Sequence, residues 1–159
     1  MDLILLRHGK AEDYNPGGDT ARELVERGRE QSRRAGKLLK QAGRLPEIVL
    51  TSPLVRARQT ADEFCKASGV PGAVIQGWLA CGMAPETALS EIAGFREFKR
   101  LAIVGHEPDL SQLIHFLLGT TGGGVTMKKG ALACIRINPP SRNGTLLYLI
   151  PPKLADELD

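Results

Sequence analysis

The residues of this chain that could carry out chemistry are two arginines and two histidines, each placed shortly after a run of apolar residues. Arg7 and His8 follow the first such run, His106 follows a later one, and Arg56 lies a few residues beyond another. A guanidinium binds phosphate oxygens through paired hydrogen bonds and stays charged at any working pH. A neutral imidazole can attack phosphorus and carry the phosphoryl group covalently until water removes it. These residue types are suited to phosphoryl transfer, in which an imidazole carries the phosphoryl group and guanidiniums stabilise its negative charge.

Short apolar segments are predicted to be the strands that position these side chains. The expected strands are residues 3–6, 48–50, 74–75 and 101–104. Helical patterns separate them, which predicts an α/β fold: a three-layer α/β/α sandwich with helices on both faces of a mostly parallel sheet. One antiparallel element is expected late in the chain, a hairpin in which residues 131–137 and 145–150 flank a turn at Asn143 and Gly144.

Capping and breaking residues mark the expected helices. One helix is predicted within residues 24–42, where apolar residues recur at helical spacing before Gly43. Others are expected to begin after Thr51–Pro53, at Pro85 and at Pro108, because prolines and hydroxyl residues suit the first turn of a helix.

The carboxyl ends of parallel strands meet at one edge of a sheet, and ligands bind beyond that edge in open α/β sheets. Arg7 with His8, Arg56, and His106 each follow a different predicted strand. We therefore expect the four side chains to converge on one site.

Composition favours an ordinary globular protein. Of the 159 residues, 42% are hydrophobic and 25% are charged, and the length suits one domain covering residues 1–159. The first residues lack a basic leader and a cleavage site, and no apolar run is long enough to cross a bilayer. Three widely spaced cysteines argue against disulfides and paired-cysteine zinc sites, so a cytoplasmic location is expected. The net charge of +3 and the scarcity of aromatic residues disfavour nucleic-acid binding.

Three segments carry a resemblance to a known family. They are Arg7-His8-Gly9, the run Thr51–Thr60 that contains Ser52, Pro53, Arg56 and Thr60, and the run Val104–Pro108 that contains His106. In this order and at this separation they resemble the histidine phosphatase superfamily, also called the phosphoglycerate mutase-like superfamily. The resemblance implies a phosphoglycerate mutase-like fold without a metal or other cofactor. It also implies that His8 is the nucleophile, that Arg7 and Arg56 bind phosphate, and that His106 stabilises charge.

The absence of an acidic side chain within residues 76–85, in the region where related enzymes have a general acid, suggests the class of substrate. Mutases and alkyl-phosphate phosphatases of this superfamily place a glutamate between the second arginine and the second histidine, whereas residues 76–85 here contain no acid. An imidazole leaving group needs less protonation than an alkoxide. This departure and the segment Gly82–Glu86 resemble the SixA-type branch, the phosphohistidine phosphatases. The implied substrate is a phosphohistidine-bearing protein of a phosphorelay or phosphotransfer system.

Two other functions stay open. The first is a phosphatase or mutase for small phosphate esters, in which Glu12, Asp13 or Glu86 would serve as the general acid. The second is a module that binds phosphate or protein without catalysis.

Further residues have competing interpretations. Arg22 is either an additional substrate contact or one more solvated cation. Ser52 is expected to cap the helix that follows it. Cys81 is expected to be unreactive, since nothing basic lies beside it in the sequence. The glycines at 122–124 are interpreted as a flexible connection into the hairpin, because they lack the lysine and hydroxyl of a phosphate loop.

Overall fold

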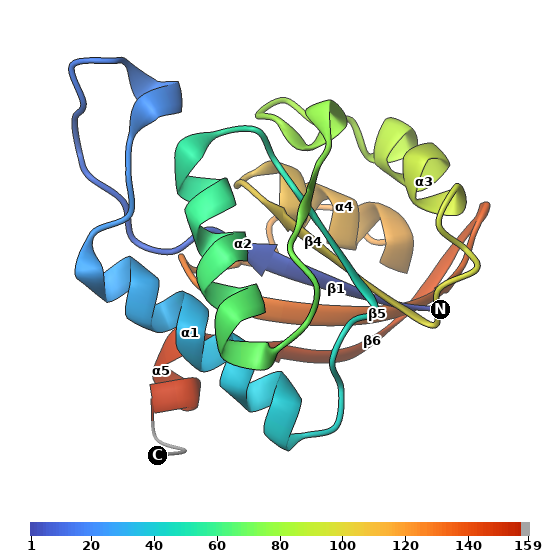
Figure 1. The fold of residues 1–159 in the computed structure, drawn as a ribbon. Helices are drawn as coiled ribbons and strands as arrows, with labels where there is room; N and C mark the ends of the chain where they lie inside the picture. Colours follow the sequence, from blue (N-terminus) through green and yellow to red (C-terminus); the bar gives the residue numbers. More distant parts are fainter. Residues whose placement is uncertain (157–159) are drawn as a thin grey trace.

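The computed structural model describes residues 1–156 and forms a six-stranded sheet (Figure 1). The strand order across the sheet is β3-β2-β4-β1-β5-β6. The strands are β1 (Asp2–Arg7), β2 (Ile48–Thr51), β3 (Val74–Ile75), β4 (Arg100–Gly105), β5 (Leu132–Asn138) and β6 (Ser141–Ile150). β3, β2, β4 and β1 run parallel, and β5 is antiparallel to both β1 and β6. The predicted mixed sheet is confirmed.

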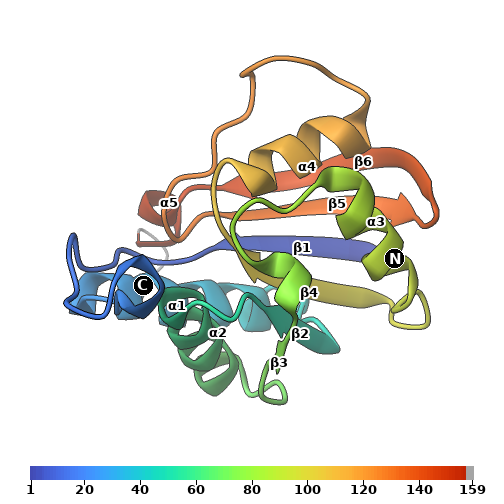
Figure 2. The same cartoon turned by 90° about the horizontal axis from the view of Figure 1, so that it is seen from above.

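Helices cover both faces of this sheet, as Figure 2 shows. On one face lie α1 (Glu26–Gln41) and α2 (Val55–Ser68), and on the other lie α3 (Pro85–Ala93) and α4 (Asp109–Leu118). The short helix α5 (Pro152–Asp156) packs against α1, and two 3-10 turns cover Asp19–Ala21 and Gly77–Leu79. No helix of the described residues is both long enough and apolar enough to span a membrane.

The central strand β1 supplies both halves of the core. Leu3 and Leu5 face the cluster that contains the inner side of α3 and α4, while Ile4 and Leu6 face the cluster beneath α1 and α2. Alternate residues of a strand point to opposite faces, so a strand covered on both sides must be apolar throughout. The four residues are at most 1% exposed. This burial fixes the strand whose last residue is Arg7.

The glycine of the Arg-His-Gly segment makes room for a helix. A Cβ on Gly9 would lie 2.4 Å from the carbonyl oxygen of Gly28 in α1, and one on Gly28 would lie 2.1 Å from the carbonyl oxygen of Lys10. Two glycines therefore let the first turn of α1 press directly on the backbone that follows His8. This contact with α1 gives Gly9 a structural reason to lack a side chain.

The late hairpin exists, but its turn was predicted at the wrong place. The chain reverses at Pro139 and Pro140, and Asn143 and Gly144 lie inside β6. Prolines have no N–H to donate, so the hydrogen bonding between β5 and β6 is interrupted at Pro139 and Pro140, before the chain reaches Asn143 and Gly144. Gly144 is needed within the strand for space, because a Cβ there would lie 3.0 Å from the Leu117 carbonyl oxygen at the end of α4.

Candidate active site

Three strand ends bring the predicted residues together. Arg7 ends β1 and is followed by His8, His106 follows β4, and Arg56 lies in the first turn of α2. The His8 N–H donates to the Gly105 carbonyl at 3.1 Å, which ties the two histidine segments together. The imidazole rings of His8 and His106 lie with their centroids 5.3 Å apart. The expected convergence is therefore observed for these side chains.

The His8 ring is held in one tautomer. Its Nδ1 lies 2.8 Å from the Gly9 carbonyl oxygen, which can only accept, so Nδ1 carries the proton of the neutral ring. Nε2 then has a free lone pair and accepts a long hydrogen bond from Arg56 Nε at 3.3 Å. The ring is 5% exposed. Burial lowers the pKa of His8 to about 3, and the nearby cations Arg56 and Arg7 act in the same direction, so the ring is neutral at ordinary pH.

Arg56 is a buried guanidinium shared between His8 and a loop. Its Nη1 donates to the Asp19 carbonyl at 2.8 Å and its Nη2 to the Asp19 carboxylate at 3.3 Å. The other carboxylate oxygen of Asp19 accepts from Arg22 Nη1 at 2.9 Å. Arg22 also donates from Nε to the Glu12 carbonyl. Arg22 is thus linked to Arg56 through Asp19, and its contact with substrate stays a prediction.

His106 pairs with Ser52 rather than with a carboxylate. Its Nε2 lies 2.7 Å from Ser52 Oγ, and both residues are at most 2% exposed. Ser52 does not cap α2 as predicted: that helix begins at Val55 without a side-chain cap, and the Ser52 hydroxyl accepts from Leu54 N–H. Burial, followed by the charge of Arg56, lowers the pKa of His106 to about 4.

The Arg7 side chain is fixed by a distant part of the chain. Its Nη1 donates to the Met127 carbonyl at 2.8 Å. Burial lowers the pKa of Arg7, while the Glu107 carboxylate opposes that shift. Even so, an arginine remains charged under all ordinary conditions.

Two buried nitrogens of the site have no hydrogen-bond partner within the described residues: Arg7 Nε and His106 Nδ1. Arg7 Nε is a donor. In the tautomer in which Ser52 donates to Nε2, His106 Nδ1 is a donor as well. Buried donors without acceptors are rare and costly in free energy. Both nitrogens belong to residues at the strand ends that also carry His8, and an anionic ligand is one group that would supply the missing acceptors.

The carboxylates considered as general acids are engaged elsewhere or exposed. The Glu12 carboxylate accepts from Asn15 Nδ2 at 3.0 Å and from Glu23 N–H at 2.9 Å, and these bonds lower its pKa. An acid with a lowered pKa is a poor proton donor at neutral pH. Asp13 and Glu86 are exposed, and Glu86 lies in the first turn of α3, where a carboxylate favours the helix.

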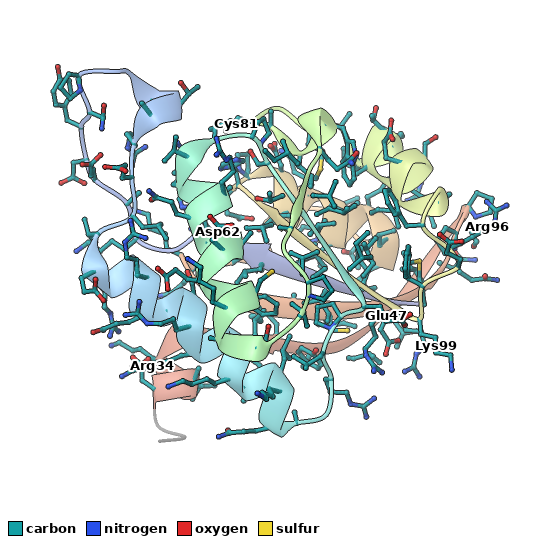
Figure 3. All side chains as sticks on the ribbon, viewed as in Figure 1. Arg34, Glu47, Asp62, Cys81, Arg96 and Lys99 are labelled. Atoms are coloured by element: carbon teal, nitrogen blue, oxygen red, sulfur yellow. The ribbon has the colours of Figure 1, made fainter. Side chains whose placement is uncertain are left out.

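Cys81 lies closer to the site than its sequence neighbours suggested. Its Sγ is 3.8 Å from Arg56 Nη2, and Figure 3 shows it by the amino-terminal end of α2. Burial raises the pKa of the thiol although Arg56 pulls it the other way. A thiol with a raised pKa is a weak nucleophile.

Sequence reasoning missed three groups that hold the site together. Asp19 positions Arg56, but it lies in a turn-rich segment whose path the sequence does not reveal. The Met127 carbonyl belongs to the main chain, so no residue type marks it. Asp109 is similar in kind: its buried carboxylate accepts from the N–H groups of Gly82 and Met83, and so holds the segment beside Cys81 in place.

Comparison with known proteins agrees with this arrangement. The family model described as "Histidine phosphatase superfamily (branch 1)" matches residues 3–79. An uncharacterised protein of Picosynechococcus sp. is 34% identical over an alignment of 147 positions, which covers 86% of this chain and 85% of that relative. The chain belongs to the histidine phosphatase superfamily. The phosphoglycerate mutase-like fold expected from the three segments is thus confirmed.

Within the histidine phosphatase superfamily, the chain is similar to both phosphatases and mutases. The solved structure of the protein histidine phosphatase SixA complexed with tungstate superposes with a TM-score of 0.89 at 25% identity, covering 97% of this chain and 99% of that one. A 2,3-bisphosphoglycerate-dependent phosphoglycerate mutase of Clavibacter michiganensis subsp. michiganensis is 42% identical over 71 residues. That alignment covers 42% of this chain but 28% of the mutase, so the likeness to the mutase is confined to part of its length.

Proposed function

We propose that this protein removes phosphate from phosphohistidine on a protein, through a covalent phosphohistidine at His8. The observation that carries the proposal is the neutral His8 ring, whose unprotonated Nε2 faces Arg56. The unpartnered nitrogens Arg7 Nε and His106 Nδ1 belong to residues at the same strand ends. A nucleophile with a free lone pair and a set of fixed donors are the two requirements of phosphoryl transfer. The likeness to SixA over nearly the whole of both chains supports the choice of substrate.

The proposed reaction has two steps. In the first, the Nε2 lone pair of His8 forms a bond to phosphorus while the bond from phosphorus to the substrate imidazole breaks, and that imidazole takes up a proton from water. In the second, water attacks the phosphorus on His8, releasing phosphate and the neutral ring. Arg7, Arg56 and His106 donate to the phosphoryl oxygens in both steps, where negative charge is spread over them. Because the leaving imidazole is far less basic than an alkoxide, the first step needs no strong carboxylic acid.

The partner expected for this chemistry is a phosphorelay or phosphotransfer protein that carries its phosphate on a histidine. A phosphatase or mutase for small phosphate esters is the second candidate, favoured by the sequence likeness to the phosphoglycerate mutase. It requires an acid for the alkoxide, and Glu12 or Glu86 would have to supply it. It therefore predicts that Glu12→Gln or Glu86→Gln strongly lowers the turnover of esters in a protein that stays folded.

The test is to trap the phosphoryl group. The protein is mixed briefly with a phosphohistidine-bearing phosphocarrier labelled with radioactive phosphate, quenched in base, and separated by size. We expect an acid-labile label on the wild type, none on His8→Ala, and an undiminished label on His115→Ala, which removes a histidine outside the site. Parallel assays compare release of phosphate from the phosphocarrier with release from sugar phosphates. Rapid hydrolysis of the sugar phosphates while the phosphocarrier stays untouched would overturn the proposed substrate. If the wild type gains no label from the phosphocarrier or from labelled sugar phosphates, catalysis through His8 is overturned.

A further inference from the structure

A basic groove adjoins the candidate active site and is not used by the chemistry proposed above. Its volume is about 720 Å³. This groove is called the basic groove below, and it is lined by Arg7, Arg27, Gln31, Lys128, Lys129, Pro151, Pro152, Lys153 and Leu154. Because Arg7 belongs to both, the groove opens directly beside the place where phosphate would bind.

Two of the three lysines of the groove, Lys128 and Lys129, lie in a segment that is anchored to the strand preceding His8. On one side of them the Met127 carbonyl accepts from Arg7 Nη1 at 2.8 Å. On the other side the Gly130 N–H donates to the carbonyls of Arg7 and His8, at 3.2 Å and 3.1 Å. Lys128, which is exposed, and Lys129, which is half-buried, therefore hold a fixed place in the chain relative to the site.

The other side of the basic groove is formed by residues 151–154, which follow β6. β6 runs in the same direction as β1, because β5 is antiparallel to both. The segment that follows β6 therefore arrives at the sheet edge where β1 ends, and α5 lies there next to α1 (Figure 2). The contact between α1 and α5 is tied by Arg27 Nη2, which lies 2.9 Å from an Asp156 carboxylate oxygen, and by an ion pair between Arg34 and Asp156. Figure 3 labels Arg34 on this side of the molecule.

The charge of the groove is unbalanced. Asp156 offsets Arg27, but within residues 1–156 no ion pair to Lys128, Lys129 or Lys153 occurs. None of the described residues that line the groove carries a carboxylate. Lysines that face a concave surface without counter-charges raise the local concentration of anionic partners. The groove is therefore complementary to an acidic surface.

The floor of the groove is apolar as well as basic. Pro151 and Pro152 line it, and the Leu154 side chain is 57% exposed. Exposed apolar groups rimmed by charge are typical of protein interaction sites. A free inorganic anion would use the lysines but leave the prolines and Leu154 in water. A protein segment would cover both.

We propose that the basic groove docks an acidic segment of the protein that carries the phosphohistidine. The proposal rests on the proposed function, and it names the partner's chemistry: carboxylates that meet Lys128, Lys129 and Lys153, and an apolar side chain that covers Leu154. Because the groove and the site share Arg7, the acidic segment lies beside the phosphohistidine on the partner's surface. Docking of this kind raises the association rate and selects among phosphohistidine proteins without entering the chemical step.

Two synthetic phosphohistidine peptides of equal length test the proposal. One carries several glutamates and a leucine on one side of the phosphohistidine, and the other carries glutamines in place of the glutamates. We expect kcat/KM to be about 10-fold higher for the glutamate peptide at low salt, and the difference to shrink as salt is added. The variant Lys128→Glu/Lys129→Glu should abolish the difference, so that the ratio of the two kcat/KM values falls to about 1 whatever the charge reversal does to both peptides in common. The matched control is Lys37→Glu/Lys40→Glu, which reverses two exposed lysines at the far end of α1 and should keep the preference.

The outcomes separate the two proposals. If wild type hydrolyses both peptides with equal kcat/KM, the docking proposal is wrong while the phosphohistidine phosphatase stands. A preference that survives in Lys128→Glu/Lys129→Glu overturns the assignment to this groove. If neither peptide is hydrolysed and labelled phosphocarrier is also untouched, the proposed function itself fails. Loss of structure in the double glutamate variant is checked by circular dichroism, and Lys128→Gln/Lys129→Gln, which removes charge without reversing it, then replaces that variant.

Discussion

Asp19 holds Arg56 through two different groups, its main-chain carbonyl at 2.8 Å from Nη1 and its carboxylate at 3.3 Å from Nη2. The same carboxylate bridges to Arg22. A phosphate that binds the fork of Arg56 must share it with this carboxylate or displace it, because both anions seek the same donors. Asp19 therefore positions the guanidinium in the free protein and competes with the anion that the site would bind.

Removing that competing charge should tighten anion binding. We expect Asp19→Asn to lower the inhibition constant of tungstate or inorganic phosphate by about 3- to 10-fold, because the side-chain charge is lost while the carbonyl still orients Arg56. Asp13→Asn, which neutralises an exposed carboxylate in the same loop, is the control and should leave the constant unchanged. An inhibition constant that stays the same or rises in Asp19→Asn would show that its carboxylate does not compete.

The two buried histidines should make the fold sensitive to acid. The pKa of His8 is lowered to about 3 and that of His106 to about 4, chiefly by burial, whereas a histidine of the unfolded chain titrates near about 6.5. Between about pH 6.5 and 4 the unfolded state therefore binds more protons than the folded state. The free energy of unfolding falls as pH falls through this window, by up to about 1.4 kcal/mol per pH unit for each histidine.

Urea denaturation at about pH 7 and about pH 5 measures this loss. The double variant His8→Gln/His106→Gln lacks both imidazoles and should show a shallower dependence on pH. Equal slopes for the wild type and the double variant would assign the acid sensitivity to other groups.

Ser52 is expected to affect both stability and turnover, because its hydroxyl is hydrogen-bonded to His106. Ser52→Ala leaves His106 Nε2 without its partner at 2.7 Å and Leu54 N–H without an acceptor, so we expect the free energy of unfolding to fall by about 1–3 kcal/mol. We also expect kcat to fall by about 10-fold, because the ring loses the group that sets its tautomer. Nitrogen-15 NMR of the imidazole reports the tautomer directly.

A second buried hydroxyl, that of Ser68 at the far end of α2, provides the control for Ser52. Ser68 bonds the Cys65 carbonyl at the opposite end of α2. Ser68→Ala should therefore reduce stability while leaving kcat and the His106 spectrum unchanged. Equal kcat in the two variants would remove Ser52 from the site.

Gly9 should tolerate no side chain. In Gly9→Ala the new Cβ would lie 2.4 Å from a carbonyl oxygen of α1, and neither backbone segment can retreat without moving His8 or the helix. We expect a loss of at least about 3 kcal/mol in the free energy of unfolding, measured in urea. Gly77→Ala, where a Cβ would meet nothing within 4 Å, is the control and should differ little from the wild type. Similar stability of the two variants would contradict the close packing of Gly9 on α1.

The strands and the placement of the four main side chains could be predicted because both depend on local patterns. A strand buried on two faces must be apolar, as Leu3 to Leu6 are, and the residues just after it must then reach the edge of the sheet. His8 and His106 follow such strands directly, so their convergence required no knowledge of the loops.

The features that could not be predicted depend on contacts between distant segments. Asp19 reaches Arg56 through the path of an irregular loop, and Arg7 is held by a carbonyl 120 residues away in the chain. The hairpin turn was misplaced because Asn143 and Gly144 form a favourable turn pair in isolation. Gly144 instead occupies a strand position that the end of α4 crowds, and local sequence carries no sign of that neighbour.

The reversed direction of β5 has a consequence for how this protein could change its partners. Because β5 enters the sheet at the edge where β1 and β4 leave it, the connection from α4 crosses beside His8 before the strand begins. That connection supplies the Met127 carbonyl and two of the three groove lysines, Lys128 and Lys129. Its earlier part, residues 120–124, is exposed and includes three consecutive glycines. Insertions or replacements there can reshape the entrance while the three strand ends stay in place. Under the docking proposal, exchanging this connection between related proteins is therefore expected to change which partner is bound while the residues of the site stay the same.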